Sequence, residues 1–115
     1  MGKIKVFGIK VDDSCGQHLK IIKDFAGSGN SDERKTANKS VRKLGDKGCN
    51  KALKSVAIEY AGSGNSDERK TAEIAVEELA KNKANKRLRE IVQKLGGSGN
   101  SDERELADKA LELIE

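Results

Sequence analysis

An octapeptide repeated without change is the feature that most constrains the fold of this chain. Gly-Ser-Gly-Asn-Ser-Asp-Glu-Arg begins at Gly27, Gly62 and Gly97, so successive copies lie 35 residues apart. A fixed period of about 20–50 residues is typical of arrays in which each unit buries its apolar face against the next. The single domain 1–115 therefore divides into a partial unit 1–26, units 27–61 and 62–96, and a C-terminal capping helix 97–115.

Each unit is interpreted as two helices, and unit 62–96 shows the pattern best. Its first helix is expected to start at the N-cap Asn65 or Ser66, with Glu68 placed as in a capping box. The second helix is expected to begin at the N-cap Asn85 and to end at a left-handed glycine (96 or 97). Apolar residues recur at helical spacing in both helices. The two stripes are Ala72, Ala75, Val76, Leu79 and Ala80, then Leu88, Ile91, Val92 and Leu95.

The units predict an all-α fold, a short right- or left-handed solenoid of helical hairpins with six to seven helices. The N-terminal segment 3–11 is the exception. It holds the place of a first helix, yet Ile4 and Val6 alternate with lysines as in a strand. A lone strand has no evident partner, so we expect a helix here, with a strand as the alternative.

The partial unit 1–26 has two possible registers. Subtracting 35 residues places His18 at the core position of Leu53. A one-residue shift instead aligns Cys15 with Cys49 and Leu19 with Leu53, and leaves His18 at the edge of the apolar stripe. The sequence leaves both registers open.

Composition argues against several classes of protein. The chain has 115 residues, of which 37% are charged and 3% aromatic, and it has no proline. Disordered segments are usually proline-rich and lack apolar periodicity. No apolar run approaches the roughly 18 residues of a membrane span, and the N-terminus lacks the apolar core of a signal peptide. We expect a soluble protein without a targeting signal, of unknown localisation, expressed in a reducing, cytoplasm-like compartment.

The layout resembles the αα-hairpin solenoids as a class, without the signature residues of a known repeat family. Residues 45–53 are faintly similar to the inter-helix loop of TAL-effector-like repeats, and residues 13–18 and 47–51 to the base-reading helix of Pumilio repeats. Verbatim Gly-Ser-Gly-Asn loops, Ser-Asp-Glu-Arg helix starts and Glu/Lys-rich faces resemble computationally designed (de novo) helical repeat proteins more closely. That resemblance implies an engineered scaffold that is not an enzyme and requires neither cofactor nor partner.

Residues that depart from the ideal unit indicate where a functional site would be located. Residues 1–60 carry 13 Lys and Arg against 7 Asp and Glu, whereas residues 61–115 carry 10 against 12. The basic half could bind an acidic protein. Nucleic acid is disfavoured because no base-stacking aromatics are interleaved with the lysines, and solvated lysines are the plain alternative. The alternative function is an engineered binding module, with contacts expected among exposed Phe7, Asn38, Arg42, Lys43 and Asn50.

The two cysteines and the single histidine allow a third interpretation. Cys15 and His18 lie three residues apart near a helix start, where a thiol pKa is lowered, so Cys15 could act as nucleophile and His18 as base. A zinc site would add Cys49 and need Asp12 or Asp13 as a fourth ligand. A Cys15–Cys49 disulfide would need the two Cα atoms within about 7 Å. Small buried thiols are the plain reading, and we expect neither a catalytic nor a metal site.

The two ends of the array lack polar capping units, which predicts self-association through exposed apolar surface. A first segment that folds back over itself would prevent it. The Gly-Ser-Gly-Asn loops have no preceding strand and are followed by Asp-Glu, so they are interpreted as turns rather than phosphate cradles. The apolar end residues are Ile4, Val6, Ile9 and Val11 at one end, and Leu106, Leu113 and Ile114 at the other.

Overall fold

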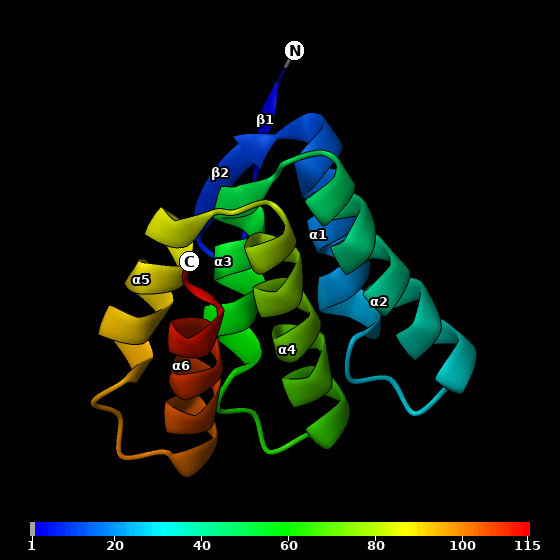
Figure 1. The fold of residues 1–115 in the computed structure, drawn as a ribbon. Helices are drawn as coiled ribbons and strands as arrows, with labels where there is room; N and C mark the ends of the chain where they lie inside the picture. Colours follow the sequence, from blue (N-terminus) through cyan, green and yellow to red (C-terminus); the bar gives the residue numbers. More distant parts are fainter. Residues whose placement is uncertain (1) are drawn as a thin grey trace.

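The structure is a computed structural model that describes residues 2–115, and it confirms a helical fold with a short N-terminal sheet. Helices α2, α4 and α6 form one layer, and α1, α3 and α5 form the layer behind it (Figure 1). In the described part of the chain, no helix combines the length and apolarity needed to cross a membrane. The elements are β1 (Lys3–Val6), β2 (Ile9–Asp12), α1 (Asp13–Phe25), α2 (Ser31–Asp46), α3 (Asn50–Tyr60), α4 (Ser66–Lys81), α5 (Asn85–Leu95) and α6 (Ser101–Leu113).

The hydrophobic core lies between the two layers of helices. Each helix turns its apolar stripe inward, as amphipathic helices do. In α1 the inward residues include Leu19 and Ile22, which are fully buried, whereas His18 is only partly buried. The structure therefore selects the shifted register for the partial unit. The largest fully buried side chains are Leu19, Ile22, Leu44, Leu53, Leu79, Leu88 and Ile91.

Residues 3–12 form an antiparallel β-hairpin, so the helix expected in this segment is wrong. Ile4 lies opposite Val11 across the two strands. The turn consists of Phe7 and Gly8, which both have positive φ angles, 53° and 76°. Two such residues make the type I′ turn whose twist suits a hairpin. The segment thus supplies its own partner strand.

The hairpin packs against α1 and α3. Val6 and Val11 are buried, and both belong to the apolar face expected to be exposed. Helix α1 carries Gly16 at the contact, where a Cβ would overlap with Ile4. The first segment therefore buries its own apolar residues by folding back over α1, and it leaves α2 uncovered.

The C-terminal end is largely covered. Leu106 is buried, and Leu113 and Ile114 pack partly buried against the core. Among the residues that the structure describes, Leu111 is the one large apolar side chain that stays exposed, at 58%. The sequence-based expectation of apolar ends thus holds only for a small patch on α6.

The three identical octapeptides form identical helix starts. The Oδ1 atoms of Asn30, Asn65 and Asn100 each accept two backbone N–H bonds, at 2.8 and 3.2 Å. In the middle copy, the backbone N–H of Asn65 donates to Ser63 Oγ, which in turn donates to Glu68 Oε1 at 2.5 Å. Asparagine is therefore the N-cap, and the capping-box glutamate acts through a serine hydroxyl.

The second helix of a unit starts differently from the expectation. The N-cap of α5 is Ala84, which has no side-chain cap, and Asn85 is already helical. Lys83 takes the left-handed conformation with φ 54°, as Gly48 does one unit earlier with φ 70°. The expected left-handed glycine at the end of α5 is also wrong, because Gly96 stays helical with φ −63°.

Candidate functional site

A groove of about 590 Å³ opens at the upper edge of the molecule, seen as in Figure 1. It lies between the hairpin, the α2–α3 connection and the first turns of α3 and α5. Its wall carries six cationic side chains and a single carboxylate, that of Asp12. A concave surface with such an excess of one charge focuses the electric field and attracts oppositely charged groups. The cations are Lys3, Lys10, Lys47, Lys51, Lys86 and Arg87.

The hairpin places two of these lysines by strand alternation. Successive side chains of a strand point to opposite faces, so the face that buries Val11 leaves Lys3 and Lys10 exposed. Across the groove, Lys51 Nζ on α3 donates to the carbonyl oxygen of Lys10 at 3.4 Å. The outer edge of β2 and the start of α3 therefore face the same space.

The helix starts at the groove add positive potential of their own. The N-caps of α3 and α5 are Cys49 and Ala84, which make no side-chain cap hydrogen bond, and the first turn of each helix holds no acid. Helices α2, α4 and α6 have an asparagine cap and two acids in the first turn. Unsatisfied N–H groups and the helix dipole make a helix N-terminus positive. The groove thus combines side-chain and backbone charge of one sign.

Most of the groove cations have no internal counter-ion. Arg87 Nη1 pairs with Glu90 Oε1 at 2.9 Å, and the hydrogen bond from Arg87 lowers the pKa of Glu90. Within residues 2–115, the five groove lysines form no salt bridge. All five are exposed, so their ammonium groups are available to an incoming anion.

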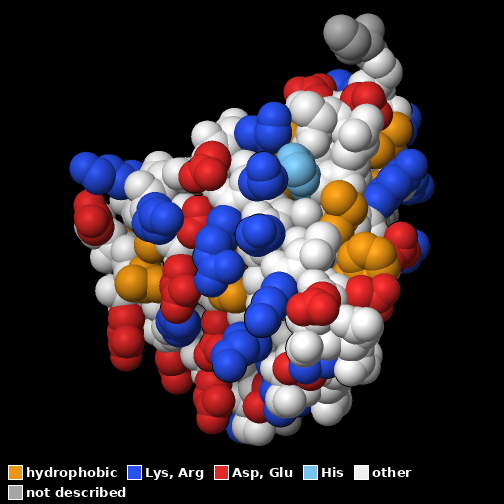
Figure 2. Space-filling model, turned by 90° about the vertical axis from the view of Figure 1, so that its right-hand side faces the viewer, with side chains coloured by type: hydrophobic (Ala, Val, Ile, Leu, Met, Phe, Trp, Pro, Cys, Tyr) orange, Lys and Arg blue, Asp and Glu red, His pale blue; other side chains and the backbone are white. Residues whose placement is uncertain are grey.

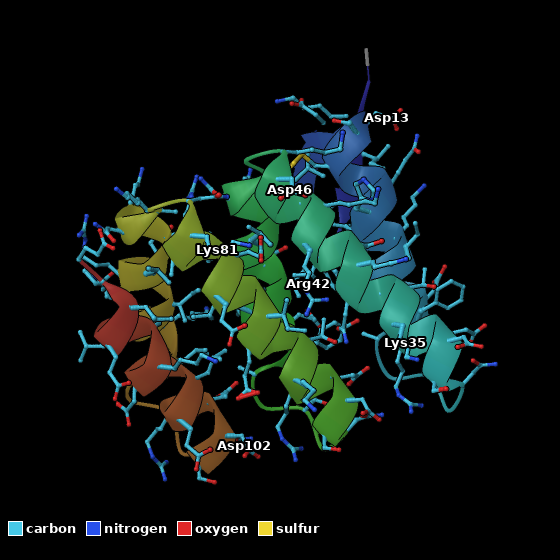
Figure 3. The ribbon with its side chains drawn as sticks, turned by 45° about the vertical axis from the view of Figure 1, so that its right-hand side comes forward. Asp13, Lys35, Arg42, Asp46, Lys81 and Asp102 are labelled. Atoms are coloured by element: carbon cyan, nitrogen blue, oxygen red, sulfur yellow. A yellow bond between two sulfur atoms is a disulfide. The ribbon has the colours of Figure 1, made fainter. Side chains whose placement is uncertain are left out.

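A disulfide between Cys15 and Cys49 forms part of the groove wall (Figure 3). The Cα atoms are 6.2 Å apart, and the bond joins the first turn of α1 to the N-cap of α3. Of the alternatives left open by the sequence, the structure takes the disulfide. In this form neither sulfur is a thiolate that could attack a substrate or bind zinc. The bond also contrasts with the reducing compartment expected for expression.

His18 lies partly buried on α1. Burial, together with the nearby charges of Lys47 and Lys43, lowers its pKa below the usual 6.5. Its Nδ1 atom is buried and has no hydrogen-bond partner within residues 2–115. With Cys15 in a disulfide, the structure does not assemble the Cys15–His18 pair. The described residues also hold no group of three or more His, Cys, Asp or Glu side chains suited to a metal ion.

Two of the five expected binding residues make hydrogen bonds between successive units, and one of them, Asn50, also lines the groove. Asn38 on α2 is half-buried, and its Oδ1 accepts a hydrogen bond from Thr71 Oγ1 on α4 at 2.9 Å. Asn50 is also half-buried, and its Oδ1 accepts from Asn82 Nδ2 at 3.0 Å. Both side chains therefore use their polar atoms inside the array.

The other three expected residues do not lie in the groove. Phe7 packs edge-on against Tyr60, with ring centroids 5.6 Å apart. Arg42 and Lys43 are exposed on α2, where Figure 2 shows Lys and Arg side chains gathered along the surface and Figure 3 labels Arg42. Arg42 and Lys43 are thus the two expected residues that remain on the surface.

The sequence-based expectation placed the basic surface within residues 1–60, and so it did not include Lys86 and Arg87. A signal for them was present in the sequence, because the second helix of each unit lacks the Asp-Glu start of the first. In an antiparallel array, the starts of α3 and α5 come to the same edge.

Comparisons with protein-family models, with curated proteins and with solved structures found no match to this chain.

Proposed function

We propose that the chain is an engineered helical-repeat scaffold without a catalytic function. The identical geometry of the three octapeptides supports this. The N-cap φ and ψ angles are −94° and 120° at Asn30, −93° and 117° at Asn65, and −89° and 121° at Asn100. Consistent caps, stripes and turns in every unit are the aim of idealised backbone design.

Unfolding experiments test the scaffold proposal. Because each unit packs on its neighbours, the helical circular dichroism signal and the Tyr60 fluorescence are expected to change in one transition at the same urea concentration. A chelator is expected to leave the midpoint unchanged. Two separated transitions, or a midpoint that falls with the chelator, would contradict a single metal-free array.

A second function, favoured by the groove, is the binding of an acidic protein segment. The observation that carries it is the set of six cations around one concave surface with a single carboxylate. Side-chain carboxylates of an Asp- or Glu-rich segment would meet the ammonium groups there. The groove wall contains no Phe, Tyr or Trp, so it lacks the stacking platform that single-stranded nucleic acid uses.

A labelled Glu-rich dodecapeptide tests this function by fluorescence anisotropy. Binding is expected to weaken with salt and to fall roughly tenfold or more in Lys51→Glu/Lys86→Glu, because two attractive charges become repulsive. The matched control Lys23→Glu/Lys94→Glu makes the same charge change at exposed positions outside the groove. It is expected to retain binding, as is Arg42→Glu/Lys43→Glu.

Equal weakening in all three variants would show that only the net charge matters, and would remove the groove as a site. Tighter binding of single-stranded DNA than of the peptide would replace the acidic segment by nucleic acid. The experiment uses the oxidised protein, because Cys15 and Cys49 form part of the groove wall. We expect expression in a reducing cytoplasm to yield the dithiol, and the disulfide to form after oxidation.

A further inference from the structure

Ion pairs between successive units repeat position by position. Arg34 Nε on α2 pairs with Asp67 Oδ2 on α4 at 3.5 Å. One unit later, Arg69 Nε on α4 pairs with Asp102 Oδ1 on α6 at 3.8 Å. We call the side of these helices that contacts the preceding unit the leading face, and the side that contacts the next unit the trailing face. Arginine lies on the trailing face and aspartate on the leading face.

Asparagine caps make a second repeated contact. Besides capping its own helix, Asn65 donates through Nδ2 to the carbonyl oxygen of Gly27 at 3.2 Å. Asn100 makes the same bond to Gly62 at 3.3 Å. The octapeptide therefore supplies both partners of these two kinds of contact between units.

Two more polar contacts connect successive helices of this layer. Thr71 Oγ1 on the leading face of α4 donates to Asn38 Oδ1 on the trailing face of α2 at 2.9 Å. Lys109 Nζ on the leading face of α6 pairs with Glu77 Oε2 on the trailing face of α4 at 2.7 Å. A fifth contact joins the ends of α4 and α2, where Asn82 Nδ2 donates to the carbonyl oxygen of Gly45 at 2.9 Å. These five kinds of contact define what a leading and a trailing face need.

The first and last helices of this layer each leave one such face open. Within residues 2–115, no helix of this layer packs on the leading face of α2 or on the trailing face of α6. Shifting the contacting positions by multiples of 35 residues identifies the open faces, and every residue found is exposed. The leading face of α2 carries Asn30, Asp32, Thr36 and Lys39, and the trailing face of α6 carries Gly97, Arg104, Asp108 and Glu112.

The two open faces are complementary at four of these five contacts, and at the fifth the matching positions hold Lys47 and Glu115. At the four, each position of one face finds on the other a residue able to make the same bond as inside the array. Charges are opposite wherever both residues are charged, and Asp108 can accept from a threonine hydroxyl as Asn38 does. The matching pairs are Arg104 with Asp32, Glu112 with Lys39, Asp108 with Thr36, and Gly97 with Asn30.

We propose that the partner of these faces is a second copy of this chain, docked with its α2 against α6 of the first. Leu111, the exposed apolar side chain, lies on the trailing face, where Val76 and Val41 are fully buried at the matching positions. Docking would cover it. The hairpin contacts α1 and α3 but not α2 in residues 2–115, so it leaves the leading face open. The contact joins two different faces, and association is therefore head-to-tail and open-ended.

The other layer limits the strength of the contact. Lys54 on α3 pairs with Glu90 on α5 at 3.3 Å. On α5 the residue matching Lys54 is Arg89, but in the shifted register the position of α1 that matches Glu90 is Ile21. Without an acid there, the ion pair is not reproduced. The contact is largely ionic, so we expect association that weakens steeply as salt screens the charges.

Sedimentation velocity over a concentration series tests the proposal. The expected result is a weight-average mass that rises with concentration at low salt and falls towards the monomer in high salt. Lys39→Glu and Glu112→Lys, each alone, are expected to weaken association roughly tenfold or more, because each sets like charges against each other. Lys94→Glu makes the same charge change as Lys39→Glu on the exposed surface of α5, and is expected to associate like the wild type.

Mixing the two variants gives the decisive measurement. The acid introduced at position 39 of one variant faces the lysine introduced at position 112 of the other, so these two faces attract again. The unchanged Glu112 of the first variant likewise faces the unchanged Lys39 of the second. The mixture is therefore expected to recover association that neither variant shows alone, and circular dichroism checks that both variants are folded. A wild type that stays monomeric at low salt, or a mixture no more associated than its components, would overturn the head-to-tail contact.

Discussion

Units 27–61 and 62–96 have helices of the same lengths, but their sequences differ in how well their residues suit a helix. Helices α2 and α4 both have 16 residues, and α3 and α5 both have 11. Yet the first of the two units holds residues that an ideal helix avoids, among them Asn38 and Gly45. The structure shows Asn38 bonded to Thr71 and Gly45 packed beneath Glu78. These two residues, which depart from the ideal unit, are thus used for contacts with the next unit.

Reducing the disulfide is expected to have the largest effect, because unit 62–96 has no comparable bond. The two cysteines are 34 residues apart, and closing a loop of that length stabilises the folded state by about 3–4 kcal/mol in the chain-entropy estimate. Urea unfolding with and without reductant measures the loss. Cys15→Ala/Cys49→Ala serves as the control, and its urea midpoint is expected to be the same with and without reductant. A wild-type urea midpoint that is also unchanged by the reductant would contradict this prediction.

Gly45→Ala tests why α2 has a glycine where α4 has Ala80. A Cβ at position 45 would overlap with the carboxylate of Glu78, which is buried against this glycine. We expect a loss of about 2 kcal/mol, the usual cost of overpacking. In the Glu78→Ala background the same substitution is expected to stabilise by up to about 1 kcal/mol, since alanine is the better helix former. The same sign in both backgrounds would show that Glu78 is not the obstacle.

Lys83→Gly and Gly48→Lys exchange the residues at one matching turn position. Both residues have positive φ, a conformation that costs a residue with a Cβ about 1 kcal/mol. Lys83→Gly is therefore expected to raise the free energy of unfolding by roughly 0.5–1 kcal/mol, and Gly48→Lys to lower it similarly. Thermal or urea unfolding of the two variants measures both. A neutral Gly48→Lys would mean that the turn relaxes.

His18 gives the smallest expected effect and concerns the partial unit. Its pKa is lowered in the folded protein, first by burial and then by Lys47 and Lys43. The unfolded chain therefore takes up a proton near pH 6.5 before the folded protein does, and stability falls as the pH decreases through the folded pKa. Unfolding free energies between pH 8 and pH 5 are expected to decline more in the wild type than in His18→Gln. Parallel curves of unfolding free energy against pH for the two proteins would show that His18 does not cause the pH dependence.

Features set by neighbouring residues could be predicted from the sequence. The asparagine cap at Asn65, the stripe of α5 and the Gly-Ser-Gly-Asn turns depend on groups within a few residues of one another. The hairpin escaped prediction because Phe7-Gly8 is not the Asn-Gly turn that signals one most strongly. Lys83 escaped because backbone hydrogen bonds hold its turn closed without a glycine.

The groove could not be predicted because it is assembled from distant segments. Lys10 comes from the hairpin, Lys51 from α3 and Lys86 from α5, and only the packing of the array brings them to one edge. The bonds of Asn38 and Asn50 to the next unit could not be predicted for the same reason. Their partners, Thr71 and Asn82, lie about one unit away in the sequence. Polar residues at such positions look like surface contacts until the neighbouring unit is placed.

The open tips of the three loops have a practical consequence. A side chain added at Gly29, Gly64 or Gly99 would meet nothing within 4 Å. All three loops lie at the lower edge of the molecule, opposite the groove (Figure 1). Exposed loop tips of this kind tolerate inserted segments and attached labels. The protein can therefore carry a tag, a dye or a surface anchor at one edge while the opposite edge, which holds the groove, remains unobstructed.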